Sequence, residues 1–206
     1  MRPTPPEKLI DNLAQARFVP SPELGGWVNE VLLMEQSGLY NQDHAHLEFA
    51  DIAYLWTNAK NTRQGNVVVG QAEIPGPPSV GGKWARGRYF QQIEEWFGRM
   101  PDFIITVDAM FADAATDLQF CALIDHELYH CGQAKDEFGG PKFKRDSGEP
   151  VFTMRGHDVE EFVGVVKRYG VGAGKMAELV EAGNSIPTIG NLDVAKACGN
   201  CHLAAA

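Results

Sequence analysis

The sequence predicts an α+β domain with a small sheet. In several segments the apolar residues recur at helical spacing, whereas three others are runs of β-branched and aromatic residues. Along the chain these segments follow the order helix, strands, helix, strand, helix, helix. Such an order is typical of the α+β class.

The first hundred residues are expected to contribute helices and strands to this domain. Apolar periodicity predicts helices from Glu7 to Phe18 and from Pro22 to Gly38, with a proline-containing break between them. Residues 51–57 and 66–74 are rich in β-branched and aromatic side chains. Because the stretch between these two runs is polar, the pair predicts a hairpin or two adjacent strands.

The second half is expected to contain the strongest helix. A loop rich in proline and glycine at 75–82 precedes an amphipathic helix at 83–100, which Pro101 ends. A strand at 102–108 and the clearest helical pattern of the chain, at 112–132, come next. The remaining expectations are a loop at 139–149, a helix at 158–169, and short helical or irregular pieces beyond.

Bulk composition limits the classes of function. At 206 residues the chain fits one domain that can bury a core. A net charge of −9 argues against a surface that broadly attracts the phosphate backbone of nucleic acids. There is no apolar run of about 18 residues that could span a membrane, and the proline-rich start lacks the apolar stretch of a secretory signal. We therefore expect a cytoplasmic protein without membrane contact.

The 112–132 helix contains the motif His126-Glu127-Leu128-Tyr129-His130. Residues four apart share a helix face, so His126 and His130 can form half of a tetrahedral zinc shell. Glu127 points to the side of this pair, where it can take the proton of a zinc-bound water that attacks a peptide carbonyl. A helix that carried these polar groups on a buried face without a role would be costly. The motif therefore predicts a zinc metallopeptidase with Glu127 as general base.

A third ligand is expected, because catalytic zinc takes three protein ligands and leaves one position open. His157 is the only other downstream histidine before the last five residues. Glu160 and Glu161 are carboxylate alternatives. Asp136 is another, although the glycine that usually accompanies a ligand at this spacing stands one position early, at Gly132.

The motif, followed by Gly156-His157-Asp158-Val159-Glu160-Glu161-Phe162, resembles the SprT/Spartan-type metallopeptidases. More closely still, the chain is similar to the putative phage metallopeptidases, over about residues 102–169. The resemblance implies a zincin-like fold, in which a small sheet packs on the active-site helix. It implies that His126, His130 and His157 bind zinc and that Glu127 is the base. It also implies that the strand at 103–107 is the sheet edge along which an extended peptide lies.

With this interpretation the chain has a catalytic zincin core at 101–172 and a tail at 173–206. Residues 1–100 contribute N-terminal helices and strands to the same domain as the core. The tail contains Cys198-Gly199-Asn200-Cys201-His202, the pattern of c-type haem attachment, but haem attachment requires export. A second metal site is an alternative, with Cys121 or Cys131 as the fourth ligand. The preferred interpretation is a tail that has no role or is redox-labile.

Other polar residues are assigned less specific roles. His44 and His46 lie among carboxylates, and a solvated loop before a strand is the preferred interpretation over a metal site. Tyr129 and Tyr169 are candidates for an oxyanion hydrogen bond, with core packing as the alternative. Asp158 is a candidate partner for a zinc-bound histidine.

Three functions follow from these residues. The leading one is zinc-dependent hydrolysis of protein or peptide substrates in the cytoplasm, which is that of a bacterial host if the chain derives from a phage. The second is a catalytically silent zinc-binding interaction module of phage origin, against which the intact Glu127 argues. The third is a zinc amidase that acts on cell-wall peptides.

Overall fold

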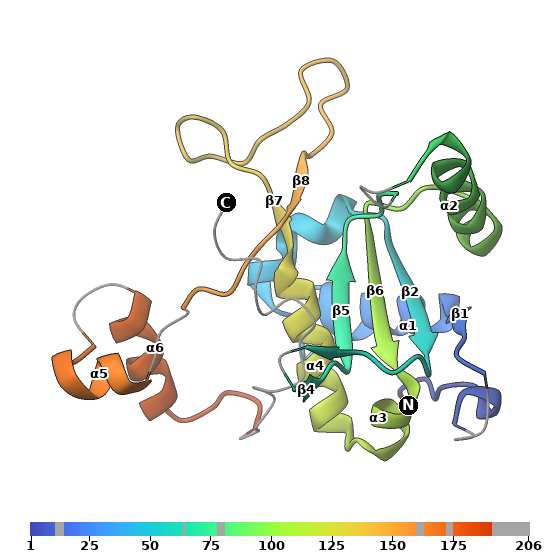
Figure 1. Cartoon of the computed structure of the whole chain (residues 1–206). Helices are drawn as coiled ribbons and strands as arrows, with labels where there is room; N and C mark the ends of the chain where they lie inside the picture. Colours follow the sequence, from blue (N-terminus) through green and yellow to red (C-terminus); the bar gives the residue numbers. More distant parts are fainter. Residues whose placement is uncertain (11–14, 64, 78–80, 160–162, 172–174, 191–206) are drawn as a thin grey trace.

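The computed structural model describes residues 1–10, 15–63, 65–77, 81–159, 163–171 and 175–190. Its centre is a four-stranded sheet in the order β1-β2-β6-β5 (Figure 1). The two inner strands, β2 and β6, run parallel, while β1 and β5 run antiparallel to their neighbours. The strands are β1 (Phe18–Pro20), β2 (Ile52–Thr57), β5 (Gly70–Glu73) and β6 (Phe103–Asp108).

The two strands predicted at 51–57 and 66–74 are not neighbours, so the predicted hairpin is wrong. β6 lies between β2 and β5, and the 66–74 run is divided between β5 and a separate two-stranded ribbon of β3 (Thr62–Arg63) and β4 (Asn66–Val67). The physical reason is the burial of β6, in which Phe103, Ile104 and Ile105 are all at most 1% exposed. A strand that is apolar on both faces is stabilised in the interior of a sheet.

The same topology corrects the expected sheet edge. β6 is an inner strand, so residues 103–107 cannot be the edge that the resemblance implied. The terminal strand on that side is β5.

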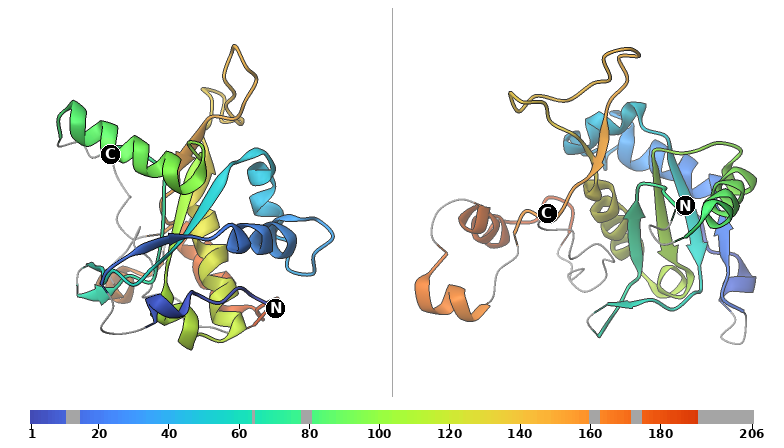
Figure 2. Two further views of the ribbon diagram at one scale, coloured as in Figure 1. Left: turned by 90° about the vertical axis from the view of Figure 1, so that its right-hand side faces the viewer. Right: turned by 45° about the horizontal axis from the view of Figure 1, so that its top comes forward.

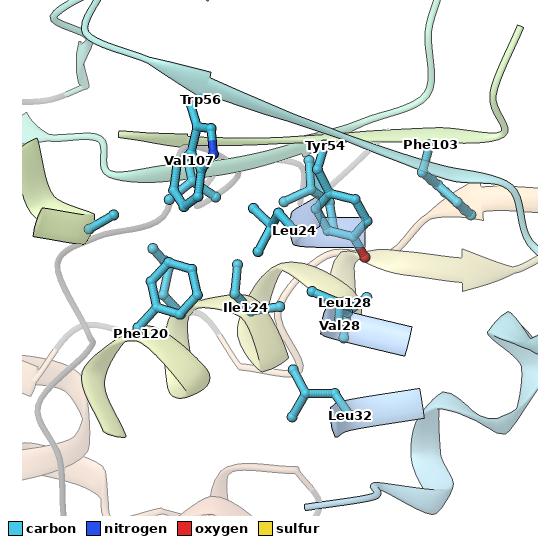
Figure 3. Close-up of a cluster of buried hydrophobic side chains, with 14 of the residues drawn as sticks. Leu24, Val28, Leu32, Tyr54, Trp56, Phe103, Val107, Phe120, Ile124 and Leu128 are labelled. Carbon is cyan, nitrogen blue, oxygen red and sulfur yellow. The ribbon is translucent and has the colours of Figure 1, made fainter. Parts of the chain in front are cut away.

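One face of the sheet packs on the main hydrophobic core. Tyr54 and Trp56 of β2 and Val107 of β6 point toward Phe120 and Leu128 of helix α4 (Asp117–His130) (Figure 3). Helix α1 (Pro22–Val28) and the π-helical η2 (Asn29–Leu33) pack against the same core.

The opposite face is contacted by the C-terminal half of α2 (Lys83–Phe97), whose N-terminal half extends away from the sheet (Figure 2). Because strand side chains alternate between faces, Ala53, Leu55 and Ile104 point to this side and pack on Ile93. The helix ends at Phe97 because Gly98 adopts the left-handed conformation (φ 68°).

The helix predicted at 112–132 is two helices, α3 (Ala109–Ala114) and α4. The break is a capping box: the Thr116 hydroxyl accepts from the Gln119 backbone N–H, and the Gln119 side chain accepts from the Thr116 N–H. This box places the start of α4 so that the motif of His126 to His130 falls in its last turns.

Beyond α4 the chain forms a hairpin of β7 (Cys131–Gln133) and β8 (Phe152–Met154), whose long connection extends away from the sheet (Figure 1). Of the predicted helix at 158–169, residues Val163–Tyr169 form α5, residues 160–162 lie outside the described residues, and His157 belongs to no helix or strand. Among the helices in the described parts of the chain, none is long and apolar enough to cross a membrane. The remaining helices are η1 (Glu7–Leu9), η3 (Gln42–Phe49) and α6 (Lys175–Asn184).

The N-terminal helix prediction is also wrong at its end. Only Glu7–Leu9 is helical before residues 11–14, which lie outside the described residues, and Phe18 begins β1. Val19 pairs with Trp56, so tertiary pairing with the sheet overrides the local helical spacing.

Candidate metal centre

Helix α4 places two motif histidines one above the other. His126 is partly buried and His130 is 2% exposed, and their ring centroids lie 5.1 Å apart. Their Nε2 atoms are 3.3 Å apart. The two rings therefore converge on one point, as the four-residue spacing predicts.

The third histidine reaches this point through the β7–β8 hairpin. β7 follows α4 directly, and its pairing of Cys131 with Met154 returns the chain to the end of the helix. The Arg155 backbone N–H then donates to the His130 carbonyl at 2.9 Å. Two residues later, Nε2 of His157 lies 3.3 Å from Nε2 of His126, although the two residues are 31 positions apart.

The spacing of the three nitrogens matches a tetrahedral metal site. Nitrogen ligands at about 2.0–2.1 Å from a tetrahedral zinc ion are separated by about 3.3–3.4 Å, and two of the pairs here measure 3.3 Å. In the described part of the chain, these three histidines form the one group of His, Cys, Asp or Glu ligand atoms that all lie within 4.8 Å of one another. The donor set therefore fits a metal ion.

A backbone contact sets the orientation of the His130 ring. Nδ1 of His130 lies 2.6 Å from the Arg155 carbonyl oxygen. Because a carbonyl only accepts, Nδ1 must donate, and in the neutral ring Nε2 then presents its lone pair to the site. Histidine ligands in metal sites are commonly held in this way.

The electrostatic environment favours the neutral form of His126 and of His130. Burial, followed by the neighbouring His130 and His157, lowers the pKa of His126 from 6.5 to about 4. Burial likewise lowers the pKa of His130, against the opposing hydrogen bond to Arg155. Neutral imidazole is the form that binds metal, so the site is prepared for an ion near neutral pH.

The carboxylate of Glu127 lies on the sheet side of α4. The residue is fully buried, and its side chain packs against Gly70 of β5 and beside Leu123. It therefore does not line the open cavity above the histidines. That cavity has a volume of about 200 Å³ and is bounded by His126, Tyr129, His130, Arg155, Gly156, His157 and Asp158.

The expectation of a solvated loop at His44 is wrong. His44 lies in η3, is 1% exposed, and has its Nε2 atom 2.8 Å from Oδ1 of Asp125 on α4. Its ring also contacts that of Tyr129, with centroids 4.6 Å apart. His46 donates to the Cys131 carbonyl at 2.7 Å, which satisfies one of the carbonyls left without an intrahelical partner at the end of α4.

Of the other candidate ligands, some lie in the described part of the chain and others lie outside it. Asp136 lies in the β7–β8 connection, where its Oδ1 atom accepts from the Phe138 and Gly140 backbone N–H groups at 2.9 Å, and it is not in the histidine cluster. Burial raises the pKa of the buried Cys131 thiol, and Cys121 is partly exposed. Five candidates lie outside the described residues: Glu160, Glu161, Cys198, Cys201 and His202.

The two tyrosines considered for an oxyanion contact differ in position. Tyr129 lines the cavity, but its hydroxyl donates to Asp43 at 2.8 Å and accepts from Asn41 at 3.0 Å. Tyr169, on α5, is 74% exposed.

Two residues near the site were not identified from the sequence. Gly70 had a usable signal, because an isolated glycine after Val67-Val68-Val69 indicates a close backbone approach. Arg155 had none, since its position depends on the β7–β8 pairing.

The protein therefore has a candidate metal centre. Three histidines cluster at the end of a helix, and this helix packs on a small mixed sheet. Residues 17–184 match the model of the family described as "Putative phage metallopeptidase", and the chain belongs to this family. A search of curated proteins and a search of solved structures each found no match. The predicted family is therefore confirmed, whereas the similarity to SprT/Spartan-type enzymes stays a prediction.

Proposed function

We propose that the protein is a zinc-dependent peptidase with a zincin-like arrangement of helix and sheet. In this proposal His126, His130 and His157 hold the zinc ion and Glu127 is the general base. The observation that carries it is the 3.3 Å spacing between Nε2 of His126 and Nε2 of each of the other two histidines. Membership of a phage metallopeptidase family supports peptide hydrolysis inside a bacterial host.

The donor set favours zinc over harder cations. Three neutral imidazoles suit zinc and other late transition metals, whereas magnesium and calcium take oxygen ligands. Three protein ligands leave one position free, and the cavity of about 200 Å³ adjoins the histidines. An open position is characteristic of catalytic rather than structural zinc.

When bound, zinc supplies Lewis acidity and lowers the pKa of water toward roughly 7. Glu127 then accepts a proton from the water that attacks the scissile carbonyl, and later returns it to the leaving amine. Glu127 directly follows His126, and its carboxylate lies against β5. We propose that an extended peptide lies along this terminal strand, with its scissile carbonyl between the Glu127 carboxylate on the sheet side of α4 and the cavity beside the histidines.

Metal analysis of the purified protein and its Glu127→Gln variant tests the proposal. We expect one zinc ion per chain in both proteins, because glutamine leaves the histidines in place. Cleavage of a quenched-fluorescent peptide library should fall by about 10²–10⁴-fold in Glu127→Gln. A wild-type protein without stoichiometric zinc would overturn the proposal. Zinc binding without cleavage by either protein would instead favour the silent interaction module, and equal cleavage by both would overturn the role of Glu127.

A further inference from the structure

Peptide hydrolysis places a negative charge on the carbonyl oxygen, and a preorganised donor at that position makes a large contribution to the rate. We propose that Arg155 is the catalytic residue that stabilises this oxyanion. The inference rests on the proposed peptidase function and adds to it a residue whose role neither the motif nor the family description assigns.

The cavity itself narrows the choice of donor. Of the described residues that line it, three are the histidines and Gly156 has no side chain. Asp158 is a carboxylate, which would repel an oxyanion. The Tyr129 hydroxyl donates its proton to Asp43 at 2.8 Å, away from any substrate. The guanidinium of Arg155 is the remaining side-chain donor.

Arg155 keeps donors available for a substrate. Its side-chain hydrogen bonds, to Oδ1 and Oδ2 of Asp158 at 2.8 and 2.9 Å, both use Nη2. A guanidinium has five N–H donors, so those on Nε and Nη1 are not used in these two contacts. At 44% side-chain exposure, Arg155 can be reached by a ligand from the cavity.

The arginine is also held in position relative to the metal ligands. Its Cζ atom lies 5.6 Å from the centre of the Tyr129 ring, and its Nη2 atom donates to the Asp158 carboxylate. Its backbone N–H and carbonyl both bond to His130. Because those contacts to His130 are made by the backbone, a substitution of the side chain leaves them in place.

In the proposed step, the water oxygen forms a bond to the carbonyl carbon while its proton passes to Glu127. The π electrons of the carbonyl move to oxygen, and Arg155 donates a hydrogen bond to the resulting anion. When the carbonyl reforms, the C–N bond breaks with its electron pair on nitrogen, and nitrogen takes the proton from Glu127. Atoms and charge balance without any further reactant, and Arg155 stays protonated throughout.

The test compares Arg155→Ala, Arg155→Lys and the matched control Arg86→Ala, which removes the same charge from an exposed position on α2. We expect all three variants to keep wild-type zinc content. In Arg155→Ala, cleavage should fall by about 10²–10³-fold, the effect of removing one oxyanion donor. Arg155→Lys should retain part of the activity, and guanidinium ion should partly restore Arg155→Ala. The Arg86→Ala control should match wild type.

Binding gives a readout that does not depend on turnover. A peptide phosphonamidate carries a tetrahedral anionic phosphorus that mimics the oxyanion, and calorimetry measures its affinity. We expect Arg155→Ala to lose phosphonamidate affinity by a factor similar to its loss of cleavage, with product-peptide affinity unchanged. Equal phosphonamidate affinity in wild type and Arg155→Ala, at equal zinc content, overturns the role of Arg155. If the wild type itself binds neither zinc nor phosphonamidate, the proposed function fails instead.

Discussion

The side chain of Glu127 lies directly against the backbone of Gly70: a Cβ atom at position 70 would stand 2.7 Å from Oε1 of Glu127. It would also stand 2.8 Å from Cδ1 of Leu123. Real Cβ atoms do not approach other atoms this closely, so only glycine fits here without displacing the carboxylate. The position of the proposed base thus depends on a residue in the terminal strand of the sheet.

Gly70→Ala should therefore impair catalysis more than zinc binding. We expect the added methyl group to displace Glu127 or Leu123, to lower the free energy of unfolding by about 1–3 kcal/mol, and to reduce cleavage at least tenfold. Zinc content should stay at the wild-type level, because the histidines are not contacted. The control is Gly26→Ala in α1, where a Cβ atom would meet nothing within 4 Å. Full activity in Gly70→Ala would contradict the proposed position of the base.

His157→Ala should weaken zinc binding at least about 100-fold, since even the loss of a residue that only orients a ligand costs 10–100-fold. A competition titration with a chromophoric chelator measures the affinity. Asp136→Asn is the matched control and should bind zinc normally, because the Asp136 carboxylate accepts hydrogen bonds within its own loop. If His157→Ala kept full affinity, the third ligand would have to be sought among Glu160, Glu161 and Asp136.

His44→Ala should strongly destabilise the fold, although His44 lies far from the motif in sequence. The substitution removes a buried ring, its contact with Asp125 at 2.8 Å and its packing on Tyr129. We expect a loss of about 2–4 kcal/mol in urea unfolding. His46→Ala, which loses one hydrogen bond from a partly buried ring, should cost about 1 kcal/mol. Equal losses in the two variants would be inconsistent with the burial of His44.

The stability of the metal-free protein should fall as pH decreases from 6.5 to 4. In this range His126 is protonated in the unfolded chain, at its ordinary pKa, but neutral in the folded protein, where burial lowers the pKa to about 4. The unfolded state then binds more protons, so acid favours unfolding. At about 1.4 kcal/mol for each pH unit, the full effect is about 3 kcal/mol.

Urea unfolding between pH 4 and pH 7.5 measures this dependence. His126→Asn serves as the control, because it removes the titrating group while other residues titrate as before. Between pH 6.5 and pH 4, the free energy of unfolding should fall by about 3 kcal/mol more in the wild type than in the control. Parallel curves would show that His126 titrates alike in the folded and unfolded states.

Local patterns predicted the inner strands of the sheet, α2 and the convergence of the two motif histidines. The β-branched runs at 51–57 and 102–108 form β2 and β6, and the proline and glycine punctuation correctly precedes α2. The helical spacing around His126 and His130 also predicted their convergence. Each of these features depends on neighbours within a few residues, which is why one sequence suffices to recognise it.

Predictions that required a partner from elsewhere in the chain were less successful. The residues at 66–74 contain no signal that β6 lies between them and β2. Phe18, which was expected to be helical, pairs with β2 instead. His44 looked like a loop residue because its partner, Asp125, lies far along the chain. In each case tertiary contacts outweigh a weak local preference.

By itself, the sequence determined the family and the helix that carries the motif, and the proposed chemistry rests on the two histidines and the glutamate at this spacing. Only the tertiary structure decided which downstream residue lies beside that pair, because the β7–β8 register brings His157 to His126. It likewise decided that Glu127 rests on Gly70 of the terminal strand, and that Arg155 borders the cavity. The physical reason is that helix periodicity is a local property, whereas these contacts depend on strand order and hairpin register.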